Sequence, residues 1–327
     1  MRRLSREANS MLKPIDAKSC RVALLAGGVS GEREISLASG EGARAALEEA
    51  GFPVTMLDPA CKEDIKQLID GNFDVAFICL HGKNGEDGAV QGMLEVLHIP
   101  YTGSGVCASA LAMDKARAKV FYDLAKIPTP ASKVVRLGAA EKSEDIFASM
   151  GGKCVVKPIA EGSTLGISIV DSAEELQCSL DQVLEKYGEA LVEKFVQGKE
   201  LTVAVIGNDN PSALPVIEIV PRSGFYDYEA KYTQGGSQHI CPARLSSEET
   251  VLVQDFAVRV HMALGCAGVS RSDFILEDGG RCWILETNTI PGMTGTSLLP
   301  DAAKVAGISF SQLCMQLIEL ALESFAR

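Results

Sequence analysis

The chain has 327 residues, which is long enough for two or three domains with cores of their own. Its content of 46% hydrophobic and 23% charged residues is that of an ordinary soluble globular protein. The net charge of −12 argues against a nucleic-acid backbone or an anionic membrane as the main partner. It does not exclude a small phosphate ligand, because phosphate sites are local groups of lysines and backbone amides.

The cysteines and histidines exclude further kinds of site. None of the ten cysteines forms a Cys-x-x-Cys pair and no His-Glu-x-x-His occurs, so zinc and thioredoxin-like redox chemistry have no support. We expect reduced thiols in a cytoplasmic protein. No apolar run approaches the roughly 18 residues of a membrane helix. Residues 1–19 are polar and basic, and we expect them to form a flexible tail.

Strands and helices are expected to alternate through the first third of the chain. Strands are expected at Arg21–Leu25, Val54–Leu57 and Val75–Leu80, with helices at Glu32–Ala50, Ile65–Ile69 and Val90–Leu97. This alternation predicts a parallel sheet with helices on both faces, in which ligands bind beyond the carboxyl ends of the strands. The polar loops Gly27–Glu32 and His81–Gly88 follow such ends and are candidate parts of a site.

The later segments are less regular. We expect one helix over Val106–Ala125, then a proline-containing linker at Ile127–Pro130, and an amphipathic helix at Phe310–Phe325 that closes the chain. A strand is expected at Thr202–Ile206. The long aromatic and polar segment Ser223–Cys241 is expected to be a lid that excludes water from a reactive intermediate.

A hairpin is expected between Arg271 and Asn288. Two apolar runs flank the turn Asp278-Gly279-Gly280, a strong local hairpin signal. The pairing expected about this turn places Leu276 opposite Arg281, Asp273 opposite Ile284, and Arg271 opposite Glu286.

The polar residues of this hairpin are expected on one face. Side chains alternate along a strand, so Arg271, Asp273, Glu286 and Asn288 would project from the same side. Two carboxylates and an amide oxygen suit Mg²⁺, which prefers oxygen ligands and completes its shell with water or phosphate. The alternative is an edge hairpin whose polar face meets water. The rigid, open turn Pro291-Gly292 favours a ligand site.

Two other segments point to a nucleotide. Lys157 ends an apolar strand and precedes the glycine-containing loop Glu161–Gly166, a plausible phosphate cover whose alternative is an ordinary hairpin loop. No P-loop motif is present. The strand Leu191–Val196 could present backbone groups to a purine edge, with Glu200 available to a ribose hydroxyl.

Other enzyme classes fit less well. Gly103–Ala108 satisfies Gly-x-Gly-x-x-Ala, but Asp58 precedes these glycines, whereas a dinucleotide fold needs the acid about 20 residues after them. A nicotinamide enzyme is therefore a poor second choice. No Gly-x-Ser-x-Gly elbow occurs, which disfavours serine-nucleophile catalysis.

From about Arg21 to its C-terminus the chain resembles the D-alanine–D-alanine ligase family of the ATP-grasp superfamily. The motifs that carry the resemblance are Gly27–Glu34, His81-Gly82, Met113–Lys115, Val156–Pro158, Glu161–Gly166, Tyr226–Tyr232, Arg271–Asp273, Glu286–Thr294 and Ser297-Leu298. Each motif alone is weak, but all of them in this order are highly specific.

The resemblance implies a three-domain ATP-grasp architecture, α/β overall and α+β in its ATP-binding part. The implied domains are an N-terminal parallel-sheet substrate domain at 20–112, a central ATP-grasp subdomain at 113–200, and a C-terminal ATP-grasp and catalytic domain at 201–327. The implied reaction joins two D-alanines to D-alanyl-D-alanine for peptidoglycan precursors, through a D-alanyl phosphate, with release of ADP and phosphate. A cytoplasmic homodimer with no nucleic-acid or membrane partner is implied as well.

The family's roles carry over to matching positions. Two Mg²⁺ ions, or Mn²⁺, would be bound by Asp273, Glu286 and Asn288. ATP would be bound by Lys115, Lys157, Ser163, Glu193, Lys194, Val196, Glu200 and Lys231. The catalytic positions would be Glu32, Ser163, Tyr232, Arg271 and Gly292. His81 would lie near the first D-alanine, and Ser297 and Leu298 would take the carboxylate of the second.

Three points bear on the exact reaction. Tyr232 resembles family members that make the dipeptide rather than D-alanyl-D-lactate, so dipeptide synthesis is expected. Thr164 replaces a more usual serine and Gly31 precedes Glu32, and both could alter affinity. Two other hypotheses stay open: an ATP-grasp carboxylate–amine ligase with a different substrate, and a nucleotide-binding regulatory protein that has lost catalysis.

Overall fold

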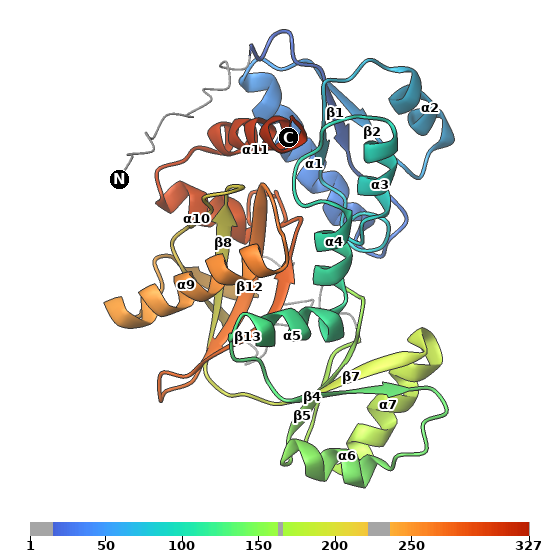
Figure 1. Cartoon of the computed structure of the whole chain (residues 1–327), viewed down its shortest axis with the longest axis vertical. Helices are drawn as coiled ribbons and strands as arrows, with labels where there is room; N and C mark the ends of the chain where they lie inside the picture. The colour runs from blue at the N-terminus through green and yellow to red at the C-terminus, as the bar shows by residue number, and fades with distance from the viewer. Residues whose placement is uncertain (1–15, 163–165, 222–235, 327) are drawn as a thin grey trace, which may run out of the picture.

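The computed structural model describes residues 16–162, 166–221 and 236–326. The structure contains three separate sheets, which follow one another along its long axis (Figure 1). The first is parallel and the other two are largely antiparallel, so the expected α/β class with an α+β ATP-binding part is confirmed.

The first sheet has the order β2-β1-β3 and is formed by β1 (Val22–Leu25), β2 (Val54–Leu57) and β3 (Val75–Ile78). All residues of β1 and β3 are buried, as expected of short apolar runs in a parallel sheet. The sheet is surrounded by helices α1 (Arg33–Glu49), α2 (Lys62–Asp70), α3 (Ala89–Val96) and α11 (Phe310–Phe325).

The C-terminal helix α11 belongs to the core of this first unit. It lies beside α1 (Figure 1), and its Leu317 and Ile318 share a hydrophobic cluster with Leu24 and Leu47. A capping box between Ser309 and Gln312 starts the helix where the amphipathic pattern predicts it.

The single helix expected over Val106–Ala125 is two helices, α4 (Val106–Met113) and α5 (Lys115–Leu124). Asp114 lies between them with φ −84° and ψ 94°, which is not helical. Its carboxylate accepts a 2.9 Å hydrogen bond from the Arg117 amide and so caps the second helix. The chain therefore turns at Asp114, and α5 starts at Lys115 in the wall of the site described below.

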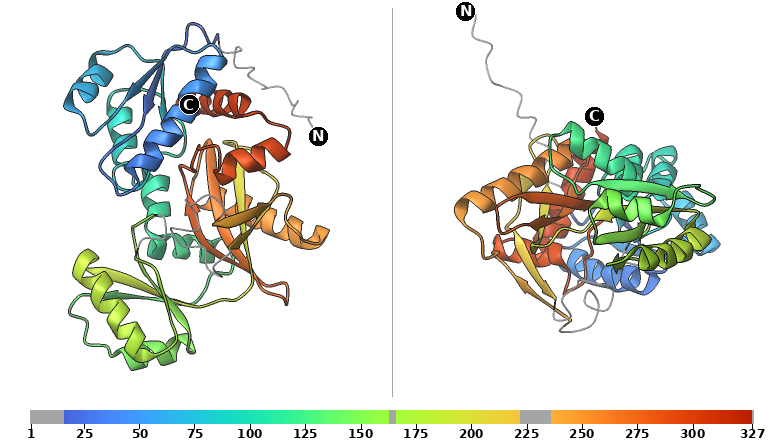
Figure 2. Two further views of the ribbon diagram at one scale, coloured as in Figure 1. Left: turned by 180° about the vertical axis from the view of Figure 1, so that it is seen from behind. Right: turned by 90° about the horizontal axis from the view of Figure 1, so that it is seen from below.

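The second sheet has the order β4-β7-β5-β6 and is antiparallel. Its strands are β4 (Ser132–Arg136), β5 (Cys154–Pro158), β6 (Ser168–Val170) and β7 (Glu189–Lys194). Helices α6 (Ser143–Met150) and α7 (Ala173–Tyr187) pack together against the sheet (Figures 1 and 2). This unit carries the expected strand-borne Lys157.

The third sheet runs β11-β10-β8-β12-β13, and β9 (Ser212–Ala213) pairs with β8. Its other strands are β8 (Lys199–Ile206), β10 (Ile217–Pro221), β11 (Ser237–Ile240), β12 (Val269–Leu276) and β13 (Cys282–Asn288). Helices α5 and α9 (Ser247–Ala263) contribute to the core against the sheet, and α10 (Leu298–Val305) follows β13. Part of the segment expected to be a lid therefore forms a strand, because Ser237–Ile240 pairs with β10. Residues 222–235 of that segment lie outside the described residues.

The hairpin forms, but its expected register is wrong. Leu276 lies opposite Cys282 rather than Arg281, a shift of one residue that would turn the polar side chains to the other face. A β-bulge shifts the register by one more residue between Asp273 and Phe274. Beyond the bulge Arg271 lies opposite Asn288 and Asp273 opposite Glu286. Two shifts restore the original face, so the four polar residues share one side as expected.

No single helix among the described residues is long and apolar enough to cross a membrane. Helices α10 and α11 reach that composition only as a pair, and they are bent by 104° at their junction.

Candidate active site

A cavity of about 120 Å³ lies where the parallel sheet meets the β12–β13 hairpin. It is lined by nine of the expected site residues, namely Glu32, His81, Lys115, Arg271, Glu286, Asn288, Gly292, Ser297 and Leu298. Residues separated by more than 250 positions in the sequence thus meet in one site. Both loops that follow the parallel strands reach this cavity, one through Glu32 and the other through His81.

Glu32 stands at the first turn of α1 and is only 7% exposed. Its loop is held by Arg33, which donates to the Gly28 carbonyl at 2.7 Å and pairs with Asp58 at 2.5 Å. Burial alone would raise the pKa of Asp58, but Arg33 and two backbone amides outweigh it and hold that pKa below its usual value. These contacts of Arg33 hold the loop that places Glu32 in the wall of the cavity.

The loop that precedes the undescribed residues 163–165 comes close to Glu32. A Cβ atom on Gly162 would lie 2.6 Å from the Glu32 Oε2 atom, so only glycine fits here without displacement. The neighbouring Glu161 carbonyl accepts a 2.6 Å hydrogen bond from the Lys115 ammonium. The expected phosphate-covering loop therefore begins directly over the cavity.

His81 is buried and lies 3.3 Å from the Ser39 hydroxyl through its Nε2 atom. Burial and the Arg271 charge lower the pKa of His81 to about 4, so the ring is neutral at pH 7. Ser39 is fully buried in α1, and its hydroxyl also accepts a 3.3 Å hydrogen bond from the Met293 amide. One serine thus connects the His81 loop with the turn after β13.

Glu86 is a site residue that the sequence reasoning did not single out. It is buried in the wall of the cavity, and its Oε2 atom accepts a 2.5 Å hydrogen bond from the Gly82 amide. Burial and the nearby Glu32 charge raise the pKa of Glu86 to about 8, so its carboxyl group is mostly protonated at pH 7. Its place in the polar loop His81–Gly88 was the available signal.

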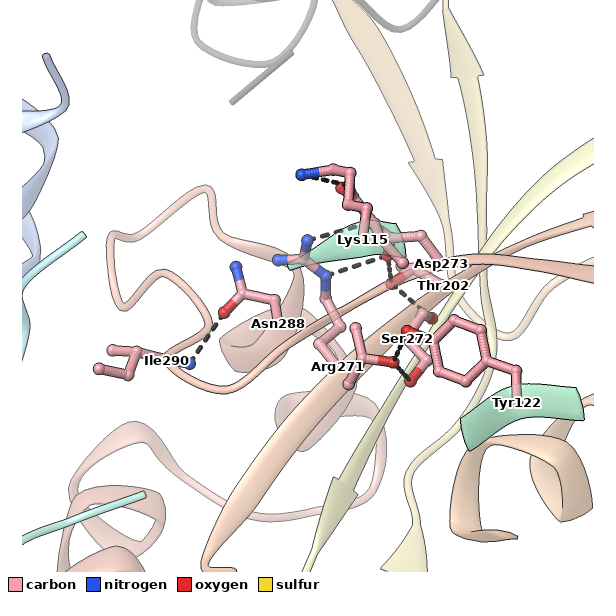
Figure 3. A network of polar contacts seen from close by, with 10 residues as sticks. Lys115, Tyr122, Thr202, Arg271, Ser272, Asp273, Asn288 and Ile290 are labelled. Carbon is pink, nitrogen blue, oxygen red and sulfur yellow. Dashed lines mark hydrogen bonds and ion pairs between the residues drawn. The ribbon is translucent and has the colours of Figure 1, made fainter. Parts of the chain in front are cut away.

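Hydrogen bonds and ion pairs connect the polar residues in and around the hairpin (Figure 3). Arg271 contacts both oxygens of Asp273 at 3.1 Å, and Thr202 on β8 donates to Asp273 Oδ1 at 2.5 Å. Glu286 lies 3.5 Å from the Lys115 ammonium. Asn288 accepts a 2.8 Å hydrogen bond from the Ile290 amide through its side-chain oxygen.

These residues fit a hard divalent cation. Asp273 and Glu286 face each other in register, with Asn288 two positions further along the same face. The donors are all oxygen atoms, which suits Mg²⁺ and not softer metals. Within the described ranges no set of three or more histidine, cysteine or acidic residues could hold a metal, so the amide of Asn288 is needed to complete a three-ligand set here.

The turn after β13 closes the other side of the cavity. Gly292 lies against Ser297, because a Cβ atom on Gly292 would be 2.7 Å from the serine hydroxyl. That hydroxyl accepts a 3.0 Å hydrogen bond from the Thr294 amide and lies 2.8 Å from the Thr294 hydroxyl. Ser297 and Leu298 stand at the start of α10, whose N-terminal amides favour an anion.

The remaining expected nucleotide residues lie apart from this cavity. Lys157 and Glu193 form a buried ion pair on neighbouring strands of the second sheet. Lys194 and Val196 line a second cavity of about 520 Å³, and Glu200 lies on β8 next to Ile275 of β12. Asp273 is not in the wall of the first cavity but is joined to Arg271, which is. Ser163, Lys231 and Tyr232 fall outside the described residues.

Comparison with known proteins gives concordant results. A family model described as D-ala D-ala ligase C-terminus matches residues 123–319, and the corresponding N-terminus model matches residues 60–104. A D-alanine--D-alanine ligase of Desulfotalea psychrophila is 46% identical over 312 residues, which is 94% of this chain and 96% of that protein.

Solved structures agree as well. A D-alanine--D-alanine ligase from Bacillus anthracis, complexed with ATP, superposes with a TM-score of 0.81 at 30% identity and covers 94% of this chain and 99% of its own. The VanG D-Ala:D-Ser ligase from Enterococcus faecalis reaches a TM-score of 0.79 at 32% identity, with 92% and 99% covered.

The parallel sheet, the two antiparallel sheets and the cavity of acids and cations between them define an ATP-grasp enzyme, an ATP-dependent ligase. Among such ligases, the chain belongs to the D-alanine–D-alanine ligase family.

Proposed function

We propose that this protein joins two D-alanine molecules into D-alanyl-D-alanine for peptidoglycan precursors and converts ATP to ADP and phosphate. The observation that carries the proposal is the single cavity that combines the buried acid Glu32 with Arg271 and Lys115. A buried carboxylate suits the ammonium of an amino acid, and the two cations suit its activated carboxylate and a phosphate.

The proposed reaction has two steps. A carboxylate oxygen of the first D-alanine attacks the γ-phosphorus of ATP, the bond to the β-phosphate oxygen breaks, and ADP leaves. The amine of the second D-alanine then attacks the acyl carbon of the D-alanyl phosphate, loses a proton, and phosphate leaves. Neither step needs a nucleophile from the protein, so positioning and charge neutralisation carry the catalysis.

The proposed substrate roles are supported by the residues that line the cavity. Glu32 binds the ammonium of the first D-alanine, and His81 supports it as a neutral ring. Arg271 and the Gly292 amide stabilise negative charge that develops on the reacting acyl group. Ser297 and Leu298 bind the carboxylate of the second D-alanine at the start of α10. Ser163 and Tyr232 link the two covering loops to Glu32.

The proposed nucleotide roles fall on the second sheet, the hairpin and the two covering loops. Lys115, Lys157 and Lys231 bind phosphates, and the loop over residues 161–166 covers them together with Ser163. Glu193, Lys194, Val196 and Glu200 bind adenine and ribose, beside the second cavity. Asp273, Glu286 and Asn288 bind two Mg²⁺ ions, or Mn²⁺, which supply neutralisation of phosphate charge when bound.

The second substrate is D-alanine rather than D-serine or D-lactate. The similarity to a D-Ala:D-Ser ligase at 32% identity makes D-serine the candidate to exclude. Tyr232 supports dipeptide synthesis over depsipeptide synthesis. A product mixture at neutral pH dominated by D-alanyl-D-serine or D-alanyl-D-lactate, when each is offered with D-alanine at equal concentration, would overturn this assignment.

We also propose the organisation of the protein. The domains are 20–112, 113–200 and 201–327, with α11 packed onto the first from the third. The protein acts in the cytoplasm as a homodimer, which sedimentation at working concentration tests directly.

The testing experiment measures ADP release with ATP and Mg²⁺ in the presence of D-alanine, L-alanine or no amino acid. Turnover with D-alanine alone, together with D-alanyl-D-alanine identified by mass spectrometry, is the expected result. ATP binding without turnover would instead support a regulatory nucleotide-binding protein. Turnover that appears only with another amine would support a different carboxylate–amine ligase.

A further inference from the structure

A buried group of three charges lies between the second sheet and helix α5. The Glu193 carboxylate pairs with Lys157 through one oxygen and with Lys119 through the other, the latter at 2.5 Å. The side chains of Lys119 and Glu193 are 7% and 4% exposed, and that of Lys157 is 6% exposed. No role follows for Lys119 from the motifs of the sequence.

Lys119 is held by a second contact besides its ion pair with Glu193. Lys119 uses two of its three N–H donors in the protein, one on Glu193 and one on the Thr129 hydroxyl at 2.7 Å. Thr129 in turn donates to the Ile284 carbonyl on β13 at 3.0 Å. This chain of contacts ties Lys119 to the linker after α5 and to the third sheet.

The positive charges of Lys157 and Lys119 keep the buried Glu193 carboxylate ionised. Burial alone would raise the pKa of Glu193, but the charges of Lys157 and Lys119 outweigh burial and hold the pKa below its usual value. If Lys157 turns to a phosphate, it leaves a buried carboxylate behind. A buried carboxylate without a cation is strongly disfavoured. A second, fixed cation removes that penalty.

We propose that Lys119 is a positioning residue for the nucleotide site: it stays paired with Glu193 and keeps that carboxylate charged and aimed while Lys157 exchanges Glu193 for a phosphate of the nucleotide. Lys119 also lines the second cavity beside Lys194 and Val196. The inference rests on the proposed placement of adenine at Glu193.

The test measures nucleotide binding by calorimetry in the wild type and in Lys119→Met. The two ligands are ATP and purine riboside triphosphate. The second ligand lacks the 6-amino group of adenine, from which the Glu193 carboxylate can accept a hydrogen bond. The wild type is expected to prefer ATP, and Lys119→Met to lose about tenfold in ATP affinity and most of that preference. In turnover, the KM for ATP should rise while kcat stays within about threefold. Lys133 lies on β4 of the same sheet and pairs with Glu141, so Lys133→Met breaks an ion pair away from Glu193 and is the matched control.

A double-mutant cycle with Glu193→Gln covers the case in which the single variant folds poorly. With the carboxylate neutralised, Lys119→Met should have little further effect on ATP affinity, because both changes act through one contact. Additive effects, or equal weakening of both nucleotides, would overturn the proposal. A wild type that does not distinguish the two nucleotides would overturn it too. If the wild type binds ATP but forms no dipeptide, the proposed reaction fails, while these affinities still decide the role of Lys119.

Discussion

Arg271 and Asp273 lie two residues apart on one strand, and both contacts between guanidinium and carboxylate are 3.1 Å long. The bidentate pair holds Asp273 on the polar face of the hairpin, opposite Glu286. Under the proposed function, a cation bound by Asp273 would compete with this pair and would free Arg271 to face the cavity.

Asp273→Asn tests the proposed metal role. The change removes a ligand charge while keeping the shape of the side chain, so we expect activity to fall about 100-fold or more, with higher Mg²⁺ needed for half-maximal rate. The measurement is ADP release over a Mg²⁺ titration. Asp278→Asn in the exposed hairpin turn is the control and should behave as wild type. An unchanged Mg²⁺ dependence in Asp273→Asn would place the metal elsewhere.

Glu86→Gln tests the buried acid through the pH dependence of stability. The pKa of Glu86 is raised from 4.5 to about 8, so between these values the folded protein holds a proton that the unfolded chain releases. Its contribution is present below pH 4.5 and is lost as the pH rises through 8. We expect the wild-type Tm to fall from about pH 5 to about pH 9 by several degrees more than that of Glu86→Gln. Equal slopes would contradict a protonated Glu86, and the exposed Glu185→Gln serves as control.

Gly162→Ala tests the close approach of the covering loop to Glu32. The added Cβ would meet the Glu32 Oε2 atom at 2.6 Å, so loop or carboxylate must move. We expect the KM for D-alanine to rise about tenfold and kcat to fall, with Tm nearly unchanged because the loop is peripheral. Gly279→Ala, where nothing lies within 4 Å, is the matched control. Wild-type kinetics in Gly162→Ala would show that the loop does not cover Glu32 during catalysis.

Ser39→Ala tests the connection between His81 and the turn after β13. Loss of the hydroxyl leaves the His81 Nε2 atom and the Met293 amide without this shared partner. We expect a loss of about 1–3 kcal/mol in stability, as for other buried hydrogen bonds. The KM for D-alanine should also rise, because the two walls of the cavity lose their common anchor. Ser149→Ala on α6 removes a hydroxyl contact remote from the site and should leave the KM unchanged. Denaturant unfolding and initial rates measure both effects.

Much of the fold follows from local patterns in the sequence. The parallel strands and helix α11 form where apolar period and capping residues predict them, because burial and local backbone chemistry agree there. The hairpin register does not follow from the turn alone, since the β12–β13 pair contains a bulge before Glu286 that the turn residues do not encode. Apolar periodicity alone predicts one continuous helix through Asp114, but this aspartate caps a new helix at Arg117, and the cap is the local signal for the break.

Many residues of the candidate site could be predicted from the sequence, but the contacts between them could not. The hairpin pattern indicates Arg271 and the proposed metal ligands, and the family resemblance indicates Glu32. Glu86 and Lys119 act through neighbours that are distant in sequence, Glu32 and Glu193, and those pairings exist only in the folded chain. No spacing rule joins such positions.

The packing of α11 against α1 and β3 has a consequence for biosynthesis. The ribosome makes β1 almost 300 residues before the helix that completes its core, at about 5–20 residues each second. The core around the first sheet therefore stays incomplete, with apolar surface exposed, until α11 is available to pack against it. The core that begins with the first strand is thus among the last to be completed, and transiently exposed apolar surface of this kind is what chaperones shield.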